Sequence, residues 1–211
     1  MVRKAASIEP IGKPHPGRKL TEKEFVEWCD EETRAEWVDG EVILIAPDNT
    51  YHNQIAGFFY KLIDAFASER VPGRVFFESI QLRLPGQRRR RQPDVIFVSE
   101  RQSDIIRETY IDGAPDLIIE VVSPDSRLRD YREKLSEYEA AGVREYWIID
   151  PLAGNLEVYA LARNRHYVRL VEKAGKFESK VVPGFYLRPE WLWSDPLPNV
   201  FKLLKEMGIK L

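Results

Sequence analysis

Two acidic side chains, Asp94 and Glu120, belong to apolar segments that are typical of buried strands. Glu120 is in the middle of DLIIEVVSP at 116–124, and Asp94 lies at the start of PDVIFV at 93–98. Burying an ionised carboxylate is costly unless a cation or hydrogen-bond donors compensate its charge. Two carboxylates on neighbouring core strands offer the oxygen ligands that Mg²⁺ and Mn²⁺ prefer. The sequence therefore predicts a metal site with Asp94 and Glu120 as its ligands.

A lysine that could serve this site follows Glu120 on an expected helix. A divalent ion can polarise a phosphoryl oxygen and lower the pKa of a bound water, and a nearby cation would help to position that water. Lys134 is the candidate, because a helix packed on the sheet could direct it toward Glu120. The alternative is an ordinary helical ion pair, since Asp130 and Glu137 lie four residues before and three residues after it.

The chain has one local basic run, in the expected loop before Asp94. The run consists of Arg88, Arg89, Arg90 and Arg91, and Arg83 precedes it on an expected strand. Guanidinium groups beside a metal centre suit phosphate capture, so these five arginines could form a groove that follows a nucleic-acid backbone. The alternative is a solvated turn, which we expect for at least two of the four. No base-reading element is visible, so the sequence predicts no base preference.

Periodicity and turn signals place the remaining elements. Helices are expected at 21–28, 51–69, 126–141 and 197–207, and strands at 36–38, 41–45, 75–84, 93–98, 116–122, 145–149, 156–161, 166–171 and 177–182. The strand at 116–122, the helix after it and the strand at 145–149 have the spacing of a crossover between parallel strands. The last three strands suggest a β-meander. The fold class is therefore α/β with a mixed sheet.

Composition narrows the classes of protein to consider. The chain has 211 residues, 44% of them hydrophobic and 31% charged, and a formal net charge of −2, which fits one globular domain. Such a balance argues against a protein that coats nucleic acid non-specifically. Its single cysteine, Cys29, excludes an intrachain disulfide and favours a cytoplasmic location. We expect a flexible lead-in at 1–19 without a secretory signal, one domain at 20–195, a C-terminal helix at 196–211 and no membrane span.

The acidic pair and the lysine resemble the PD-(D/E)XK nuclease superfamily. The longer pattern is similar to one branch of it, the bacterial Uma-type restriction endonucleases, over about residues 20–190. The matching segments are AEWVDGEVI at 35–43, His52, QPDVIFV at 92–98, PDLIIEVVSP at 115–124 and KLSEYEAAGVREYWIIDP at 134–151. The superfamily's usual lysine lies two residues after the second acid, where this chain has Val122. The resemblance therefore requires Lys134 to take that place.

The resemblance implies a restriction-endonuclease-like mixed sheet flanked by helices, with extra antiparallel strands near the C-terminus. It also implies cleavage of phosphodiester bonds in nucleic acid, most simply DNA, with Mg²⁺ or Mn²⁺. Glu36 could be an additional ligand, with Glu41 as its competitor, and His52 could orient a ligand or handle a proton. Tyr138 would lie above the site, near the nucleic acid, or simply pack. By the habit of the family, the chain would form a homodimer.

Two other functions stay open. The first is a nuclease fold without cleavage, which would bind nucleic acid or dimerise independently of metal, the displaced lysine marking lost catalysis. The second is an unrelated hydrolase that uses Asp94 and Glu120 as a general acid–base pair, and its activity would survive chelation. That version gives Lys134 no role.

Overall fold

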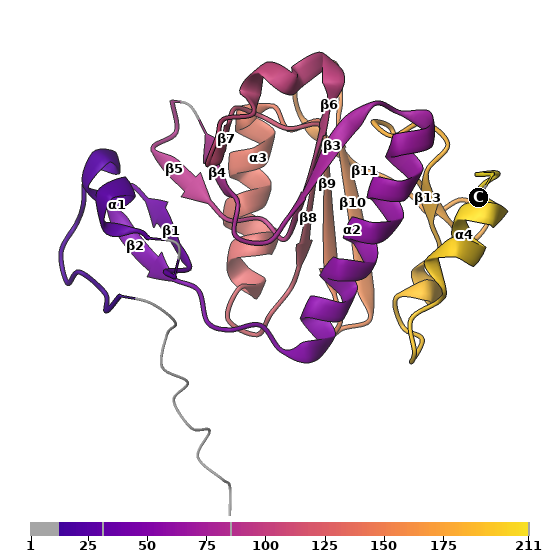
Figure 1. Ribbon diagram of the computed structural model, residues 1–211, viewed down its shortest axis with the longest axis horizontal. Coiled ribbons are helices and arrows are strands. Elements are labelled where there is room, and N and C mark those ends of the chain that lie inside the picture. Colours follow the sequence, from indigo (N-terminus) through magenta and orange to yellow (C-terminus); the bar gives the residue numbers. More distant parts are fainter. Residues whose placement is uncertain (1–12, 31, 85, 211) are drawn as a thin grey trace, which may run out of the picture.

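The computed structural model describes residues 13–30, 32–84 and 86–210, and its centre is a six-stranded mixed sheet (Figure 1). The strand order is β11-β10-β9-β8-β6-β3. The strands are β3 (Gly73–Phe77), β6 (Val95–Ser99), β8 (Leu117–Val121), β9 (Glu145–Asp150), β10 (Asn155–Leu161) and β11 (Tyr167–Arg169). Glu120 lies within β8, and Asp94 immediately precedes β6. These two strands are neighbours, as the sequence predicts.

A helical crossover connects two parallel strands of this sheet. After β8 the chain forms a π-helical turn, η2 (Arg129–Lys134), continues as α3 (Leu135–Ala141), and returns as β9, which pairs parallel to β8. The predicted crossover is confirmed, but its regular α-helix is shorter than expected because the first turns are not α-helical. Gly142 ends the helix in the left-handed conformation with φ 91°, which a glycine adopts without steric cost.

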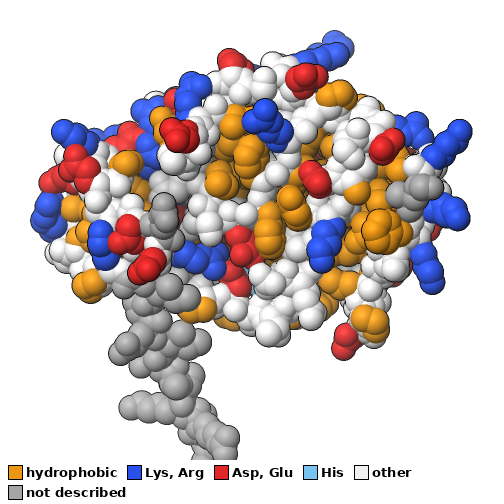
Figure 2. All heavy atoms as spheres, in the orientation of Figure 1, with side chains coloured by type: hydrophobic (Ala, Val, Ile, Leu, Met, Phe, Trp, Pro, Cys, Tyr) orange, Lys and Arg blue, Asp and Glu red, His pale blue; other side chains and the backbone are white. Residues whose placement is uncertain are grey.

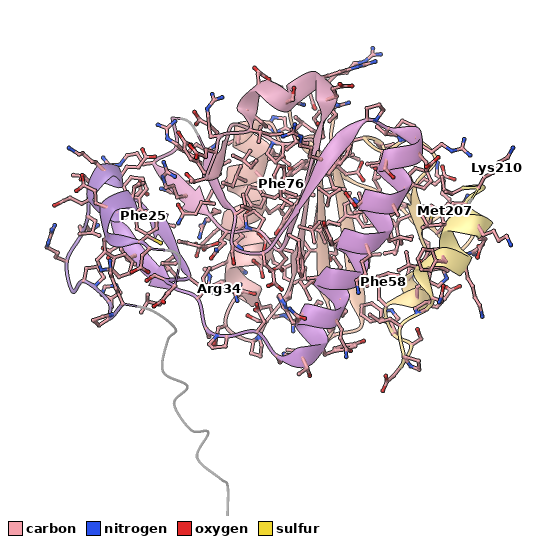
Figure 3. The ribbon with its side chains drawn as sticks, viewed as in Figure 1. Phe25, Arg34, Phe58, Phe76, Met207 and Lys210 are labelled. Atoms are coloured by element: carbon pink, nitrogen blue, oxygen red, sulfur yellow. The ribbon has the colours of Figure 1, made fainter. Side chains whose placement is uncertain are left out.

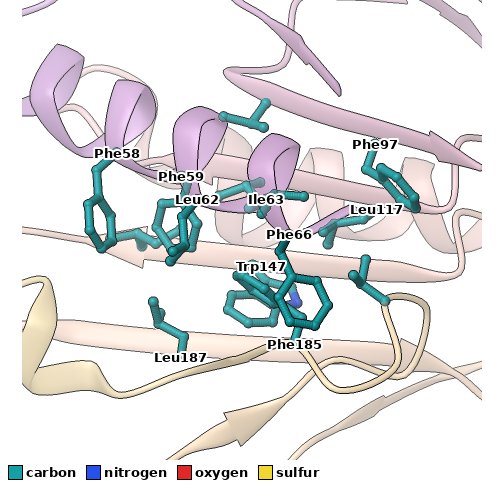
Figure 4. Close-up of a cluster of buried hydrophobic side chains, with 14 of the residues drawn as sticks. Phe58, Phe59, Leu62, Ile63, Phe66, Phe97, Leu117, Trp147, Phe185 and Leu187 are labelled. Atoms are coloured by element: carbon teal, nitrogen blue, oxygen red, sulfur yellow. The ribbon is translucent and has the colours of Figure 1, made fainter. Parts of the chain in front are cut away.

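Each face of the six-stranded sheet is covered by a helix. Helix α2 (Thr50–Arg70) packs its apolar side on alternate strand residues, including Leu117 and Ile119, and Trp147 and Phe185 lie in the same cluster (Figure 4). The intervening residue Ile118 faces the other cluster, which includes Tyr138 of α3. Burial on both faces explains the near-continuous apolar run around Glu120. It also places Glu120 on the α3 side of the sheet.

A second, five-stranded sheet lies beside the first, in the order β2-β1-β5-β4-β7. Its strands are β1 (Ala35–Val38), β2 (Glu41–Leu44), β4 (Gln81–Leu84), β5 (Arg89–Arg91) and β7 (Tyr110–Asp112). Helix α1 (Glu22–Trp28) begins with a capping box, in which Thr21 and Glu24 bond each other's backbone N–H groups, and packs Phe25 against this sheet. Strands β1 and β2 pair antiparallel as a hairpin.

The structure corrects two expectations in this region. The expected strand at 75–84 is two strands in different sheets, because Glu78 and Ser79 adopt φ of 46° and 54° and turn the chain between β3 and β4. The arginine run is not a loop, since Arg89–Arg91 form β5 between β1 and β4. Strand β7 and the 3₁₀ helix η1 (Glu100–Ile105) were not predicted from the sequence.

The C-terminal segment covers the α2 side of the large sheet. Strand β12 (Phe177–Glu178) pairs with β13 (Tyr186–Leu187) in a separate two-stranded sheet, so of the three strands expected to form a meander only β10 and β11 pair with each other. The 3₁₀ helix η3 (Pro189–Trp191) and helix α4 (Val200–Glu206) follow, and α4 contacts α2. Part of the expected lead-in, residues 1–12, lies outside the described residues. In the part of the chain that is described, no helix has the length and apolarity that crossing a membrane requires.

Candidate metal and phosphodiester site

Glu120 is anchored by two donors from the crossover helix. Its Oε1 atom accepts a hydrogen bond from the Tyr138 hydroxyl at 2.8 Å and lies 2.9 Å from Lys134 Nζ. The side chain of Glu120 is 3% exposed, and Lys134 and Tyr138 are buried with it. The contact between Lys134 and Glu120 that the crossover spacing allowed is therefore present.

Lys134 is shared among three carboxylates. Besides Glu120, its Nζ lies 3.4 Å from Glu36 Oε1 and 3.2 Å from Asp130 Oδ1. The helical pair with Asp130 thus exists beside the contact with Glu120, and the two interpretations of Lys134 are not exclusive. Lys134 is the last residue of the π-helical turn, a conformation that often occurs at functional sites. Glu137, the other expected pairing partner, bonds Arg89 and Arg91 instead.

Asp94 is held by the backbone of β8 and by a histidine from α2. Asp94 Oδ2 accepts a 2.6 Å hydrogen bond from the Val121 N–H group and lies 3.3 Å from His52 Nε2. His52 is in the first turn of α2, where Asn49 caps the helix by accepting from the His52 N–H group. Asp48 Oδ1 is 3.6 Å from His52 Nδ1 on the other side of the ring. The helix start therefore fixes the histidine against Asp94.

The two acids line one pocket of about 260 Å³. The loop before α2, the turn after β8 and η2 form its walls, and the lining includes Glu36, Asp48, His52, Gln92, Ser126 and Arg129. Arg34, labelled in Figure 3 just before β1, also lines the pocket and pairs with Asp48 at 2.7 Å. The sequence did not single out Arg34 or Gln92, because their partners in space, Asp48 and Glu36, are distant in the chain.

The pocket has oxygen atoms suitable for a divalent ion. Each acid has one oxygen fixed by protein donors, whereas Asp94 Oδ1 and Glu120 Oε2 have no hydrogen bond or ion pair among the described residues. The buried Gln92 Oε1 also has no partner there. In the described ranges, no three or more His, Cys, Asp and Glu side chains are grouped so that they could hold a metal ion. Two carboxylates and an open pocket fit Mg²⁺ or Mn²⁺, which retain several waters.

The charges around the site leave a negative surplus. Four carboxylates, those of Glu36, Asp94, Glu120 and Asp130, face three cationic side chains, those of Lys134, His52 and Arg91. Burial, together with the carboxylates of Asp94, Asp130 and Glu36, raises the pKa of Glu120 to about 8 against the opposing effect of Lys134. Burial alone would lower the pKa of Lys134, but Glu120, Glu36 and Asp130 outweigh it and hold that pKa well above its usual value. We take Lys134 as protonated, and an additional cation would relieve the surplus.

Glu36 and His52 have shifted pKa values with different partners. Burial would raise the pKa of Glu36, but Lys134 and Arg91 lower it to about 2, so Glu36 is a carboxylate at neutral pH. Both Glu36 oxygens are already engaged, because Oε2 accepts from Arg91 Nη1 at 2.8 Å and Oε1 accepts from the Gln92 N–H group at 3.2 Å. Burial would lower the pKa of His52, but Asp94 and then Asp48 raise it to about 9. Protonated His52 is therefore the cation that faces Asp94.

Most of the arginine run is engaged in ion pairs within the protein. Arg91 is fully buried and contacts Glu36 and Glu137, and Arg89 contacts Asp39 at 2.6 Å and Glu137 at 2.9 Å. Arg90 and Arg83 share Glu22 Oε1, at 2.9 and 2.6 Å. Arg88 is exposed, 3.9 Å from Asp39. On the face in Figure 2, basic and acidic side chains are interspersed.

Three other residues considered in the sequence have clear positions. Tyr138 is fully buried beneath Glu120, where it holds a carboxylate oxygen rather than lying at the surface. Glu41, the competitor of Glu36, is exposed and pairs with Lys19. Glu36 alone of these two contacts Lys134.

Comparison with known proteins shows the family and the fold of the chain. The model of a family described as "Uma2: Putative restriction endonuclease" matches residues 22–190. The chain is similar in structure to a "putative nuclease belonging to DUF820" from Anabaena variabilis, with a TM-score of 0.68 and 19% sequence identity. That match covers 82% of this chain and 97% of the Anabaena chain. No curated protein matches the chain. The α/β fold, with a mixed sheet between helices and extra antiparallel strands, is thus the fold of a known crystal structure.

Proposed function

The chain belongs to the Uma2 family of restriction endonucleases, and from its site we propose that it is a divalent-metal-dependent endonuclease that hydrolyses phosphodiester bonds in DNA. One observation carries the proposal. Asp94 and Glu120 each have one oxygen fixed by protein donors and one oxygen that no described residue hydrogen-bonds, in a pocket that also contains the Lys134 ammonium group. This is the arrangement that metal-assisted attack on a phosphodiester requires.

Asp94 and Glu120 would hold Mg²⁺ or Mn²⁺ through these two oxygens. When bound, the ion would polarise the phosphoryl oxygens and lower the pKa of a coordinated water. His52 and the Val121 N–H group fix Asp94 Oδ2, and Tyr138 fixes Glu120 Oε1, so the free oxygens have defined positions. Such support for the ligands typically matters for both metal affinity and activity.

Lys134 would orient the attacking water and stabilise negative charge that develops on the phosphate. Glu36 and Asp130 contact its ammonium group from other directions, so Lys134 remains in place when Glu120 binds the ion. An ammonium group preorganised in a site of low polarity stabilises a transition state more effectively than one in water. Glu36 thus acts through Lys134, since Arg91 and the Gln92 N–H group already bond its oxygens.

Calorimetric titration of Mn²⁺ and Mg²⁺ into the full chain tests the metal site. We expect stoichiometric binding to the wild type and its loss in Asp94→Ala and Glu120→Ala. Asp64→Ala is the matched control, because Asp64 is an exposed carboxylate on α2 outside the pocket lining. Lys134→Ala should retain metal binding, since removing a cation does not weaken the attraction of the site for an ion.

Cleavage of plasmid DNA with and without chelator tests the reaction. We expect Lys134→Ala to reduce cleavage at least about a hundredfold while binding metal normally. Cleavage that persists in excess chelator would contradict the metal mechanism and favour an acid–base hydrolase. Metal binding without cleavage of any DNA or RNA would instead indicate a catalytically inactive binding module.

A further inference from the structure

A second arginine-rich segment, RLRDYR at 127–132, lies next to the pocket. It forms the turn before η2 and most of η2 itself. Arg129 and Arg132 have no ion pair in the described part of the chain, unlike the arginines of β5. The cations available near the two acids are therefore in this segment rather than at 88–91.

This segment lines a shallow hollow of about 520 Å³, which we call the strand hollow. Its lining comprises Pro124, Asp125, Arg127, Leu128, Tyr131, Arg132, Asn155 and Glu157. Pro124 and Asp125 also line the pocket that contains Asp94 and Glu120, so the two depressions share one wall. Arg129 lies on the pocket side of that wall. A nucleic-acid strand that leaves the pocket can therefore enter the strand hollow directly.

The lining of the strand hollow includes an aromatic ring, an apolar side chain and positively charged side chains. Leu128 is 61% exposed, so an apolar side chain is accessible to a ligand at this hollow. The Arg127 guanidinium lies 5.9 Å from the ring centre of Tyr131 and pairs with Asp150 at 3.1 Å. The Tyr131 hydroxyl accepts from Asn155 Nδ2 at 3.2 Å, so its ring is held in place.

Two acidic side chains also border the strand hollow, and only one of them is unpaired in the described residues. Glu157 pairs with Arg169 at 3.0 Å, whereas Asp125 is exposed. Arg127 is paired with Asp150, and the unpaired Arg129 and Arg132 outnumber Asp125 among the described residues, so the unpaired local charge is positive despite the negative net charge of the chain.

We propose that the strand hollow binds an unpaired nucleotide segment, of DNA or RNA, that flanks the scissile phosphate. This proposal rests on the proposed function, because the pocket must hold the phosphate that is cleaved. Arg129 and Arg132 contact phosphates, and Leu128 and Tyr131 contact the face of a base. Base faces are accessible in single strands, whereas a duplex presents edges and phosphates, so the substrate of this site is single-stranded where it leaves the pocket.

Binding without metal tests this directly. Fluorescence anisotropy in chelator would use the full chain with a labelled single-stranded oligodeoxynucleotide, the matching oligoribonucleotide and the DNA duplex. The Leu128→Ser/Arg132→Gln double variant changes two exposed side chains, and circular dichroism would verify its fold. We expect single-strand affinity to fall about tenfold, with a smaller change for the duplex. Arg101→Gln, at the opposite end of β6 from Asp94, is the control and should stay within about twofold.

The outcomes separate this proposal from the nuclease activity itself. Unchanged single-strand affinity in the double variant, or an equal loss for the duplex, overturns the strand hollow even if Asp94→Ala abolishes cleavage. Selective loss of single-strand binding supports it even if the wild type cleaves nothing. The tighter of the DNA and RNA arms identifies the sugar that the site accepts.

Discussion

Two buried carboxylates on adjacent strands, Glu120 on β8 and Glu145 on β9, differ in how many of their oxygens have hydrogen-bond donors. Both are almost inaccessible, with exposures of 3% and 0%, and burial raises the pKa of each. Glu145 Oε2 accepts from the backbone N–H groups of Lys180 and Val181, at 2.6 and 3.2 Å, and Oε1 accepts from Trp147 Nε1. Every oxygen of Glu145 thus has a donor, and Glu145 does not line the pocket that contains Glu120.

Only one of the two carboxylate oxygens of Glu120 has a partner among the described residues. Its Oε1 is held by Tyr138 and Lys134, whereas Oε2 has no partner in the described chain and the residue lines the pocket. Glu145 fastens the 179–182 segment to the sheet, and Glu120 retains a free ligand atom. Burial of an acid therefore does not identify a site, but burial with one unpaired oxygen beside a pocket does.

The largest difference between Glu120 and Glu145 should appear in the free energy of unfolding when each is replaced by glutamine. Glu145→Gln turns an NH₂ group toward N–H donors and leaves buried donors unpaired, so we expect a loss of about 2–3 kcal/mol in unfolding free energy. Glu120→Gln fixes this side chain in a neutral form, which burial and the surrounding carboxylates already favour, and its amide oxygen can still accept from Tyr138 and Lys134. Its stability should stay within about 1 kcal/mol of the wild type or rise. Chemical denaturation measures both, and an equal loss in the two variants would contradict the distinction.

The sequence predicted the elements that carry Glu120, because the first strand, the crossover helix and the second strand can each be recognised from apolar residues and turn signals close together in the chain. It also placed Asp94 at the start of the strand that pairs with β8, and Lys134 on the helical segment that follows β8. It could not separate Glu120 from Glu145, since both are acids beside apolar residues and the difference depends on donors from 179–182 and from α3. The arginine run illustrates the same limit. Its partners, Glu22, Glu36, Asp39 and Glu137, converge only after β5 joins the small sheet.

Metal addition should sharpen the comparison at a smaller scale. At a free Mn²⁺ concentration ten times the dissociation constant, binding to the folded state alone stabilises the wild type by about 1.4 kcal/mol. Glu145→Gln should show the same increment from its lower baseline, because its carboxylate does not reach the pocket. Glu120→Gln should show none. Thermal unfolding with and without Mn²⁺ measures these increments, and a shift retained in Glu120→Gln would place the ion elsewhere.

A further comparison removes one hydroxyl donor from each carboxylate. Tyr138→Phe deletes the 2.8 Å bond to Glu120 but keeps the ring against Tyr146, whose centre is 5.0 Å away, so it should cost about 1 kcal/mol. Ser179→Ala deletes a longer 3.3 Å contact to Glu145 and acceptors for two backbone N–H groups, with a cost of about 1–2 kcal/mol. Only Tyr138→Phe should weaken Mn²⁺ binding, by about tenfold, because only Glu120 needs its free oxygen aimed at an ion. Calorimetry on both variants decides this: equal Mn²⁺ affinities would mean that Tyr138 contributes packing and a hydrogen bond but does not position the ligand.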